Sequence, residues 1–470
     1  MADLPLHPPR NPSSFTSSDQ HSGEQNGLHP ETPILTRRGF LPAKGIKPGD
    51  EVLDRDGCWT RVTGTARVPF TAVGMLRLRI AADNRALVLA PGHHVLAVRN
   101  EVKCSRRGGR CRRKSRLADP ARLEWIPAKD LTVSDLVVIP QRPAVPASDL
   151  GLVIDLARLL RRASHRGVMY YDTRVRQTLI DAVHAPLGPV PAGRLYGVTA
   201  DAVHLGRRRG FRRTFPSHLT VDDDLAMWLG LFMAEGWVNK QSVEFALHID
   251  ERETYARFLS DYAGRVWRAQ CVVTTSETNR GLRLKIGSVL LRDLCAALTE
   301  GAPARTKFVP PMVFGWPIKA RQAFVKGLFR GDGCLRGREI SLGSASERLV
   351  TDTRLLLMGI GIKSSFRINV PGPDRHEARI RGRLIPPTVS YGLHISGSDF
   401  NAFAAFEEEA AAVSNMWPDR KGILTDTHLF VPVRHILPML CFQGDAYVIA
   451  TESGSLLSTC VVRDADAGMD

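Results

Sequence analysis

The sequence predicts an α+β protein in which a duplicated helix-and-strand unit is inserted into an all-β domain. Residues 228–236, Trp-Leu-Gly-Leu-Phe-Met-Ala-Glu-Gly, recur in altered form at 325–333 as Val-Lys-Gly-Leu-Phe-Arg-Gly-Asp-Gly. The same order of strand-like and helix-like segments follows each copy, which indicates two pseudo-twofold repeats in one chain. Short strand-like runs separated by turn signals precede the repeats and return after them.

Composition limits the classes of partner. The chain has 470 residues, enough for two or three domains, and its formal net charge of +16 favours an anionic partner, most often nucleic acid. No apolar run has the length of a membrane span, and the N-terminus lacks a signal-peptide pattern, so we expect a cytoplasmic protein that is neither secreted nor membrane-bound. The eight cysteines are irregularly spaced, which predicts reduced thiols.

The spacing of small residues in the duplicated motif predicts a close helix crossing. Gly230 and Ala234 are four residues apart, as are Gly327 and Gly331, so each pair lies on one face of a helix. Glycine inside a helix costs about 1 kcal/mol relative to alanine, and a close approach of two helix backbones would explain why it occurs here.

Each motif places a carboxylate at the end of its helix. If the helices cross, Glu235 and Asp332 emerge side by side at ends that already carry partial negative charge. The two carboxylates repel each other unless a cation lies between them, which predicts a divalent metal with oxygen ligands, Mg²⁺ or Mn²⁺. The alternative is that each is a surface carboxylate that ends a core helix.

The two motifs resemble those of the LAGLIDADG homing endonucleases, of the DOD type, which cut double-stranded DNA. The third and ninth motif positions are glycine, the seventh is small, and the eighth is the family's metal-binding acid, here Glu235 and Asp332. The sixth position, which is usually acidic, is Met233 and Arg330. The resemblance implies an endonuclease domain over 225–415 with two αββαββα repeats, 225–298 and 319–409. It implies a monomer with an internal pseudo-dimer, whose two sheets form a saddle on DNA.

The resemblance also suggests further site residues. Family members often have a lysine near the metal that polarises water, and Lys285 fits that position in the first repeat. His394 occupies the equivalent position in the second repeat, either as a base or as an ordinary strand histidine. Arginine suits phosphates and guanine edges, and the candidates for DNA contact on the strands are Arg280, Arg283, Arg367, Arg379, Arg381 and Arg383.

The flanking strands resemble a Hint (intein) domain, divided into residues 27–140 and 425–464. The matching segments are Thr36–Gly39, Lys47–Asp50, Leu89–His93 and Trp125–Pro140. Because inteins often carry a LAGLIDADG endonuclease as an insertion, the order of these segments supports the resemblance.

The residues that protein splicing needs are mostly absent. Gly27 stands where the family has a Cys or Ser nucleophile, and Arg463-Asp464 stands where it has His-Asn. His93 matches a family histidine, but Ala90 replaces the threonine of that element. Arginine cannot shuttle a proton. We therefore expect a scaffold that no longer splices.

The other segments carry little chemistry. Residues 1–26 are expected to be a disordered leader and 465–470 a tail. Residues 99–122 hold ten Lys or Arg, as a solvated insertion or a phosphate-contacting arm, and Cys104 and Cys111 within them are free thiols or part of a zinc site. Residues 141–224 are a linker with a predicted helix over Asp149–Arg162 and a basic cluster that contacts DNA or is a charged loop: Arg207, Arg208, Arg209, Arg212 and Arg213.

These features predict a monomeric, metal-dependent, site-specific endonuclease whose partner is double-stranded DNA. One alternative is a DNA- or RNA-binding LAGLIDADG protein of the maturase or regulator type that does not cut. Another is residual intein autoprocessing. Members that do not cut usually lose one or both acids, and this chain retains both.

Overall fold

The computed structural model describes most of the chain. The described residues are 26–70, 74–99, 104–107, 110–113, 122–133, 135–142, 153–156, 195–198, 202–207, 210–216, 218–276, 280–371, 378–380, 383–385, 388–407, 422–439 and 442–464. The leader up to residue 25, the tail 465–470 and much of 141–224 lie outside this set. No helix within the described residues is both long and apolar enough to cross a membrane.

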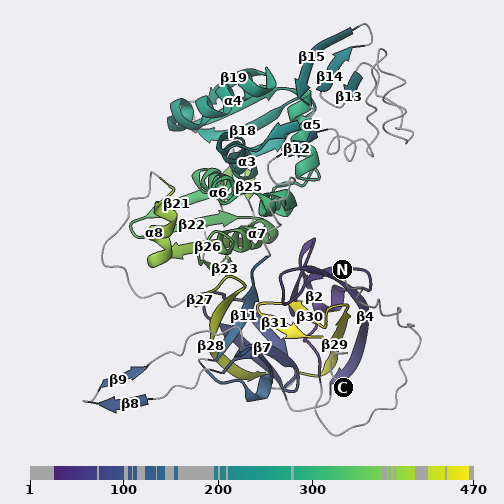
Figure 1. Cartoon of the computed structure of the whole chain (residues 1–470), viewed down its shortest axis with the longest axis vertical. Coiled ribbons are helices and arrows are strands. Elements are labelled where there is room, and N and C mark those ends of the chain that lie inside the picture. Colours follow the sequence, from purple (N-terminus) through teal and green to yellow (C-terminus); the bar gives the residue numbers. More distant parts are fainter. Residues whose placement is uncertain are drawn as a thin grey trace, which may run out of the picture.

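The molecule is elongated, with the duplicated unit at one end and a β lobe at the other (Figure 1). The β lobe is formed by the first and last parts of the chain, drawn in purple, blue and yellow. The second repeat lies between the first repeat and the β lobe.

The first repeat is a four-stranded antiparallel sheet with helices packed against it. The sheet order is β17-β18-β20-β19. Its elements are α3 (Asp223–Glu235), β17 (Gly236–Val238), β18 (Val243–His248), α4 (Arg257–Trp267), β19 (Gln270–Ser276), β20 (Gly281–Gly287) and α5 (Val289–Leu298). Leu282, Leu284 and Ile286 of β20 are buried and alternate with exposed residues, so one face of the sheet covers the core and the other is open.

The second repeat has the same order of elements and the same sheet order, β21-β22-β26-β23. Its elements are α6 (Ile318–Asp332), β21 (Gly333–Arg336), β22 (Glu339–Ser344), α7 (Glu347–Met358), β23 (Ser365–Asn369), β26 (Ser390–Ser396) and α8 (Ser398–Ala404). An additional hairpin, β24 (Ala378–Ile380) and β25 (Arg383–Ile385), is inserted between β23 and β26.

The β lobe contains two sheets built from both ends of the chain. In the smaller sheet, β2 (Gly39–Pro42), β1 (Pro33–Thr36), β3 (Glu51–Leu53) and β4 (Trp59–Phe70) are completed by β29 (Gly444–Thr451). The larger sheet has the order β30 (Ser455–Leu457), β31 (Val461–Arg463), β7 (His94–Val98), β11 (Leu136–Pro140), β28 (His428–Met439), β5 (Met75–Ile80) and β6 (Ala86–Leu89). Two short strands extend it, β10 (Glu124–Pro127) beside β7 and β27 (Ile423–Leu424) beside β28. The duplicated unit is therefore an insertion within one β fold.

The segment between the lobes differs from its prediction. Val153–Asp155, expected within the predicted helix over Asp149–Arg162, forms strand β12, which pairs with β16 (His218–Thr220). Leu156 follows in helical geometry, and the rest of that predicted helix lies outside the described residues. Ile154 is fully buried, and its β-branched side chain suits a strand. Tertiary pairing thus overrides the helix-like spacing of the apolar residues. The described residues also form a three-stranded sheet of β13 (Leu195–Val198), β14 (Ala202–Arg207) and β15 (Gly210–Pro216).

The basic insertion forms a hairpin, β8 (Cys104–Arg107) and β9 (Arg110–Arg113), which projects from the β lobe (Figure 1). In its register Cys104 pairs with Arg113 and Cys111 pairs with Arg106, so the two cysteines are not cross-strand partners.

Candidate active site at the helix crossing

Glycines allow α3 and α6 to cross in backbone contact. A Cβ atom on Gly230 would lie 2.1 Å from the carbonyl oxygen of Phe324, and one on Gly327 would lie 2.2 Å from that of Met227. Real Cβ atoms do not approach backbone so closely, so each glycine provides space for the opposite helix. Further along, a Cβ on Gly331 would meet the Ala234 side chain at 2.4 Å.

A second pair of glycines ends the two helices at the crossing. Gly236 follows α3 with φ −95° and ψ 152°, and Gly333 follows α6 with φ −87° and ψ 156°, so both leave the helix in extended geometry. A Cβ would lie 2.2 Å from the Phe232 ring in the first case and 2.0 Å from the Phe329 carbonyl oxygen in the second. Glycine at these positions lets a strand begin immediately after each acid.

This geometry brings Glu235 and Asp332 together at one end of the helix pair. A Cβ on Gly331, the neighbour of Asp332, would lie 3.1 Å from the Glu235 Cγ atom. Burial and then the negative charges of Asp332 and Glu251 raise the pKa of Glu235 to about 7. Burial raises the pKa of Asp332 to about 6. The pair therefore holds protons more tightly than ordinary carboxyls do.

Among the described residues, Lys307 is the cation that acts on both carboxyls, and no sequence motif identifies it. Its ammonium donates hydrogen bonds to the carbonyl oxygens of Met233 at 2.8 Å, Ala234 at 3.3 Å and Gly236 at 2.9 Å. Burial lowers the pKa of Lys307, and the charges of Asp332 and Glu235 oppose that change. The ammonium thus satisfies carbonyls at the negative end of α3 and partly neutralises the acids beside it.

Lys307 lies before α6, in the segment between the repeats, and helix α7 holds its backbone. Ser346 caps α7 by accepting a hydrogen bond from Leu349 N at 3.1 Å, and it donates one to the Lys307 carbonyl oxygen at 2.6 Å. Only a tertiary contact links Lys307 to α3. No motif in the sequence marks it.

The donor set is compatible with a magnesium-type ion. Glu235 and Asp332 supply carboxylate oxygens, and the described residues contain no group of three or more His, Cys, Asp or Glu side chains positioned to chelate one ion. Mg²⁺ usually keeps several waters and binds through one or two carboxylates together with substrate phosphates. Two adjacent half-buried carboxyls with raised pKa values are the feature that a divalent cation would stabilise.

Lys285 and His394 occupy equivalent positions in the two sheets. Lys285 faces Glu244 across β18 and β20, and His394 faces Ser341 across β22 and β26. Lys285 is exposed on the open face of the first sheet. The His394 ring bonds through Nδ1 to the Glu339 carboxylate, so one ring nitrogen is already engaged.

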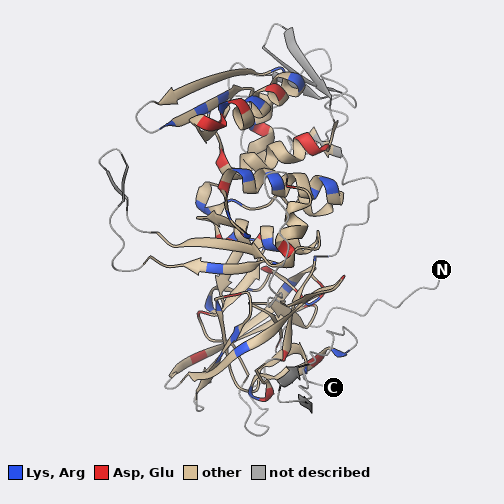
Figure 2. Cartoon of the chain, turned by 90° about the vertical axis from the view of Figure 1, so that its left-hand side faces the viewer, with Lys and Arg blue, Asp and Glu red and all other residues tan. Residues whose placement is uncertain are grey.

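The candidate DNA-contacting arginines fall into three groups. Arg280 and Arg283 are exposed but paired, Arg280 with Asp250 at 2.7 Å and Arg283 with the fully buried Glu244 through Nε at 2.8 Å. Arg367 is exposed on β23. The side chains of Arg207, Arg212, Arg213, Arg379 and Arg383 are outside the described set, as are residues Arg208, Arg209 and Arg381. Figure 2 shows Lys and Arg on both lobes, interspersed with Asp and Glu.

The residues at the expected splicing positions are part of the β lobe. Gly27 has φ +139°, and a Cβ there would lie 2.7 Å from the Ala446 Cβ atom. The Gly27 carbonyl accepts a hydrogen bond from Ala90 N at 2.8 Å. Burial and the nearby His94 lower the pKa of His93 to about 4.

The C-terminal pair of these positions is also integrated into the lobe. Arg463 ends β31, and the Asp464 carboxylate accepts hydrogen bonds from Thr451 N at 2.8 Å and Thr451 Oγ1 at 3.1 Å. Asp464 therefore braces the turn after β29 through hydrogen bonds within the β lobe.

Comparison with known proteins supports the motif. The model of the LAGLIDADG-like domain matches residues 319–405, so the chain contains a LAGLIDADG domain. This confirms the resemblance for the second repeat.

Relatives include an uncharacterized protein of Methanocaldococcus jannaschii, 20% identical over 77% of this chain and 42% of its own length. A DNA polymerase of Thermococcus kodakarensis is 30% identical over 34% of this chain and 9% of its own length. The chain thus spans less than half the length of either relative. The ATP-dependent DNA helicase Hel308 of Thermococcus kodakarensis is 23% identical over 94% of this chain and 36% of its own length.

Solved structures similar to this chain include the homing endonuclease I-DmoI in complex with DNA and Mn, at 15% identity and a TM-score of 0.30, covering 41% of this chain and 99% of that one. Full-length DUF199/WhiA of Thermatoga maritima has 12% identity and a TM-score of 0.26, covering 39% of this chain and 54% of that one.

Proposed function

We propose that the protein is a divalent-metal-dependent, site-specific endonuclease that acts on double-stranded DNA. The observation that carries the proposal is the pair of half-buried carboxyls, Glu235 and Asp332, at the crossing of α3 with α6, the helix on which the LAGLIDADG-like match begins. A structural carboxylate has no need of a like-charged neighbour, whereas a metal site does.

Glu235 and Asp332 would hold Mg²⁺ or Mn²⁺ between the helix ends. The ion would supply an activated water and relieve charge on the scissile phosphate. Lys307 would orient the end of α3 through its three carbonyl contacts, and its charge opposes the rise in the pKa of both carboxyls, which favours their anionic form. In this proposal Lys307 is a positioning residue, and Lys285 and His394 are further candidates on the open sheet faces.

The open faces of the two sheets would form the DNA surface. Lys285, Arg283 and Arg367 project from them, and the net charge of +16 favours association with a polyanion. Phosphate contacts would position the duplex, and base contacts would select the sequence.

The β lobe would be an intein-type Hint scaffold that has lost its splicing chemistry. Gly27 offers no nucleophile, Arg463 cannot transfer a proton, and the Asp464 carboxylate is engaged with Thr451. The lobe would now serve as structural support for the endonuclease.

Cleavage of an unbiased DNA pool tests the proposal. The full chain is incubated with a random-sequence duplex pool and Mg²⁺ or Mn²⁺, and new ends are sequenced. We expect double-strand breaks at one sequence family. Glu235→Gln and Asp332→Asn should each reduce the cleavage rate by at least about 100-fold while leaving DNA binding measurable. Glu253→Gln, at an exposed carboxylate, is the matched control.

Specific binding without cleavage in either metal would favour a regulator or maturase function. Cleavage that survives both substitutions would contradict the proposed site. Ligated flanking tags in a fusion protein would contradict the loss of splicing.

A further inference from the structure

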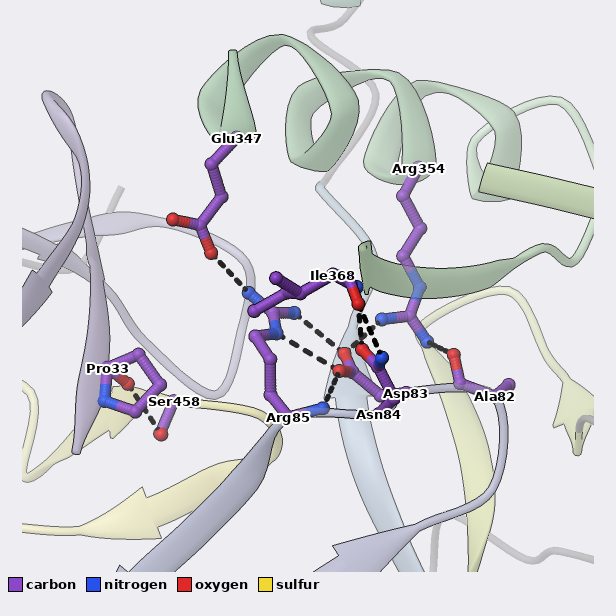
Figure 3. Close-up of polar contacts among 9 residues, drawn as sticks. All are labelled: Pro33, Ala82, Asp83, Asn84, Arg85, Glu347, Arg354, Ile368 and Ser458. Atoms are coloured by element: carbon purple, nitrogen blue, oxygen red, sulfur yellow. Dashed lines mark hydrogen bonds and ion pairs between the residues drawn. The ribbon is translucent and has the colours of Figure 1, made fainter. Parts of the chain in front are cut away.

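A loop of the β lobe completes the second sheet of the LAGLIDADG unit. Residues 81–85, between β5 and β6, lie along the outer edge of β23 (Figure 3). We call these residues the docking loop. Phe366 N donates to the Ala82 carbonyl at 2.8 Å, and Asn84 N donates to the Phe366 carbonyl at 3.3 Å.

The Asn84 side chain continues this pairing in the manner of a strand. Its Oδ1 accepts a hydrogen bond from Ile368 N at 2.8 Å, and its Nδ2 donates to the Ile368 carbonyl at 3.0 Å. The outward-facing backbone groups of Phe366 and Ile368 are therefore all satisfied by the docking loop, and β23 is no longer an open edge.

A buried ionic cluster fixes the docking loop to helix α7. The fully buried Asp83 carboxylate accepts hydrogen bonds from Arg85 Nε at 3.0 Å, Arg85 Nη2 at 2.7 Å and Arg354 Nη1 at 2.8 Å. Glu347 of α7 lies 3.5 Å from Arg85 Nη1. Two carboxylates and two guanidinium groups balance, so the cluster is complete only when the lobes are docked (Figure 3).

The backbone and the packing of the loop are also specialised. Ala82 has φ +61°, a left-handed conformation that non-glycine residues adopt only when their surroundings enforce it. The Arg85 guanidinium lies between the rings of Phe40, at 4.1 Å, and Phe366, at 4.0 Å. Strand β23 is thus held from its edge and from its buried face.

The first repeat has no such support within the described residues. Its corresponding edge strand, β19, ends the sheet order, and Val272 is 56% exposed there. The helix that corresponds to α7 is α4, where Arg257 and Asp261 form an exposed ion pair. The two sheets are equivalent in topology but differ in what holds their outer strands.

We propose that the docking loop is a positioning element that sets β23, and with it Arg367, for contact with DNA, so that recognition by the second repeat depends on the β lobe. This inference rests on the proposed function. Arg367 follows Phe366 directly, so its side chain projects from the opposite face of the strand. This is the exposed face of the sheet that would contact DNA.

Hydrogen exchange tests, without DNA, whether the docking loop fixes β23. In Asn84→Ala, which leaves the ionic cluster intact, the Ile368 amide should exchange at least about tenfold faster than in the wild type, because it loses its acceptor. Amides of β19 should not change. Asp261→Asn on α4 is the control and should alter neither strand. Unchanged protection at Ile368 would overturn the proposal.

A double-mutant cycle tests whether the docking loop positions Arg367 for DNA contact. Binding is measured on duplexes that the wild type selects from a random-sequence pool. Asn84→Ala and Arg367→Ala should each weaken binding several-fold, and the double variant should bind no worse than Arg367→Ala alone. Asn84→Ala combined with Arg283→Ala in the first repeat should be additive.

Additivity in both cycles would overturn the positioning role, since a general loss of stability affects both repeats alike. If the wild type selects no duplex, the proposed DNA function fails, and the exchange measurement still decides whether the loop fixes the strand.

Discussion

At the residue scale, the site is defined by an unfavourable pair and one compensating charge. Glu235 and Asp332 lie half-buried beside each other, and both carboxyls hold their protons more tightly than usual. Lys307 opposes this effect for both. The energy of the arrangement thus depends on pH and on any cation that enters it.

The stability of the metal-free protein should depend on pH through Glu235. Its folded pKa of about 7 lies above the ordinary value of 4.5, so folding favours the protonated form. The resulting stabilisation is complete below pH 4.5 and is lost as pH rises through 7. We expect Glu235→Gln to match the wild type at pH 5 and to exceed it at pH 8.5 by about 1 kcal/mol, a value reduced by partial solvent screening.

Chemical denaturation at the two pH values, in the presence of a chelator, measures this difference. Adding Mg²⁺ at pH 8.5 should stabilise the wild type and not the variant. Equal pH profiles for the two proteins would show that folding does not raise the pKa of Glu235. Glu253→Gln, at an exposed position, should follow the wild type.

At the scale of elements, the helix crossing depends on glycines that the sequence pattern identifies. Gly230 and Gly327 each face backbone atoms of the opposite helix. By contrast, Gly264 lies inside α4 with no atom within 4 Å of the position of an added Cβ. Glycine therefore has opposite consequences in two helices of the same repeat.

Alanine substitutions should separate these two cases. Gly230→Ala forces a methyl group into the Phe324 carbonyl and should cost about 2–3 kcal/mol of unfolding free energy. Gly264→Ala adds a methyl group in open space and should stabilise the protein by up to about 1 kcal/mol, because alanine has the better helix propensity. Urea denaturation of the two variants measures both changes in the free energy of unfolding. A stabilising Gly230→Ala would mean that the helices do not cross this closely.

Sequence patterns failed where an element depends on a distant partner. The apolar spacing over Asp149–Arg162 predicts a helix, yet Val153–Asp155 pairs with His218–Thr220 as a strand. Lys307 likewise reaches α3 only in the folded chain. Neither relation leaves a local signal.

At the scale of the whole molecule, helix α7 couples the site to the β lobe. Its residues Leu349 to Met358 are all buried, including the charged Asp352 and Arg354. Arg354 binds Asp83 of the β lobe, and Ser346, which caps α7, holds the Lys307 backbone beside the acids. The β lobe and the candidate site therefore share one structural helix.

The duplicated unit and the β lobe should consequently unfold together. We expect calorimetry of the wild type to show one transition whose calorimetric and van't Hoff enthalpies agree for the whole chain. Asp83→Asn leaves Arg354 buried without its full counter-charge and should cost about 3 kcal/mol, separating the transition into two. Two transitions in the wild type would show that the lobes are independent.

The sequence by itself determined the duplication, the small residues of the crossing and the acids Glu235 and Asp332, because helical periodicity and motif spacing are local properties. The tertiary structure decided which lysine lies beside those acids, which strands pair between the two parts of the predicted β domain, and how the docking loop closes the second sheet. Those relations join residues far apart in the sequence, and only packing brings their charges and backbone groups within contact distance.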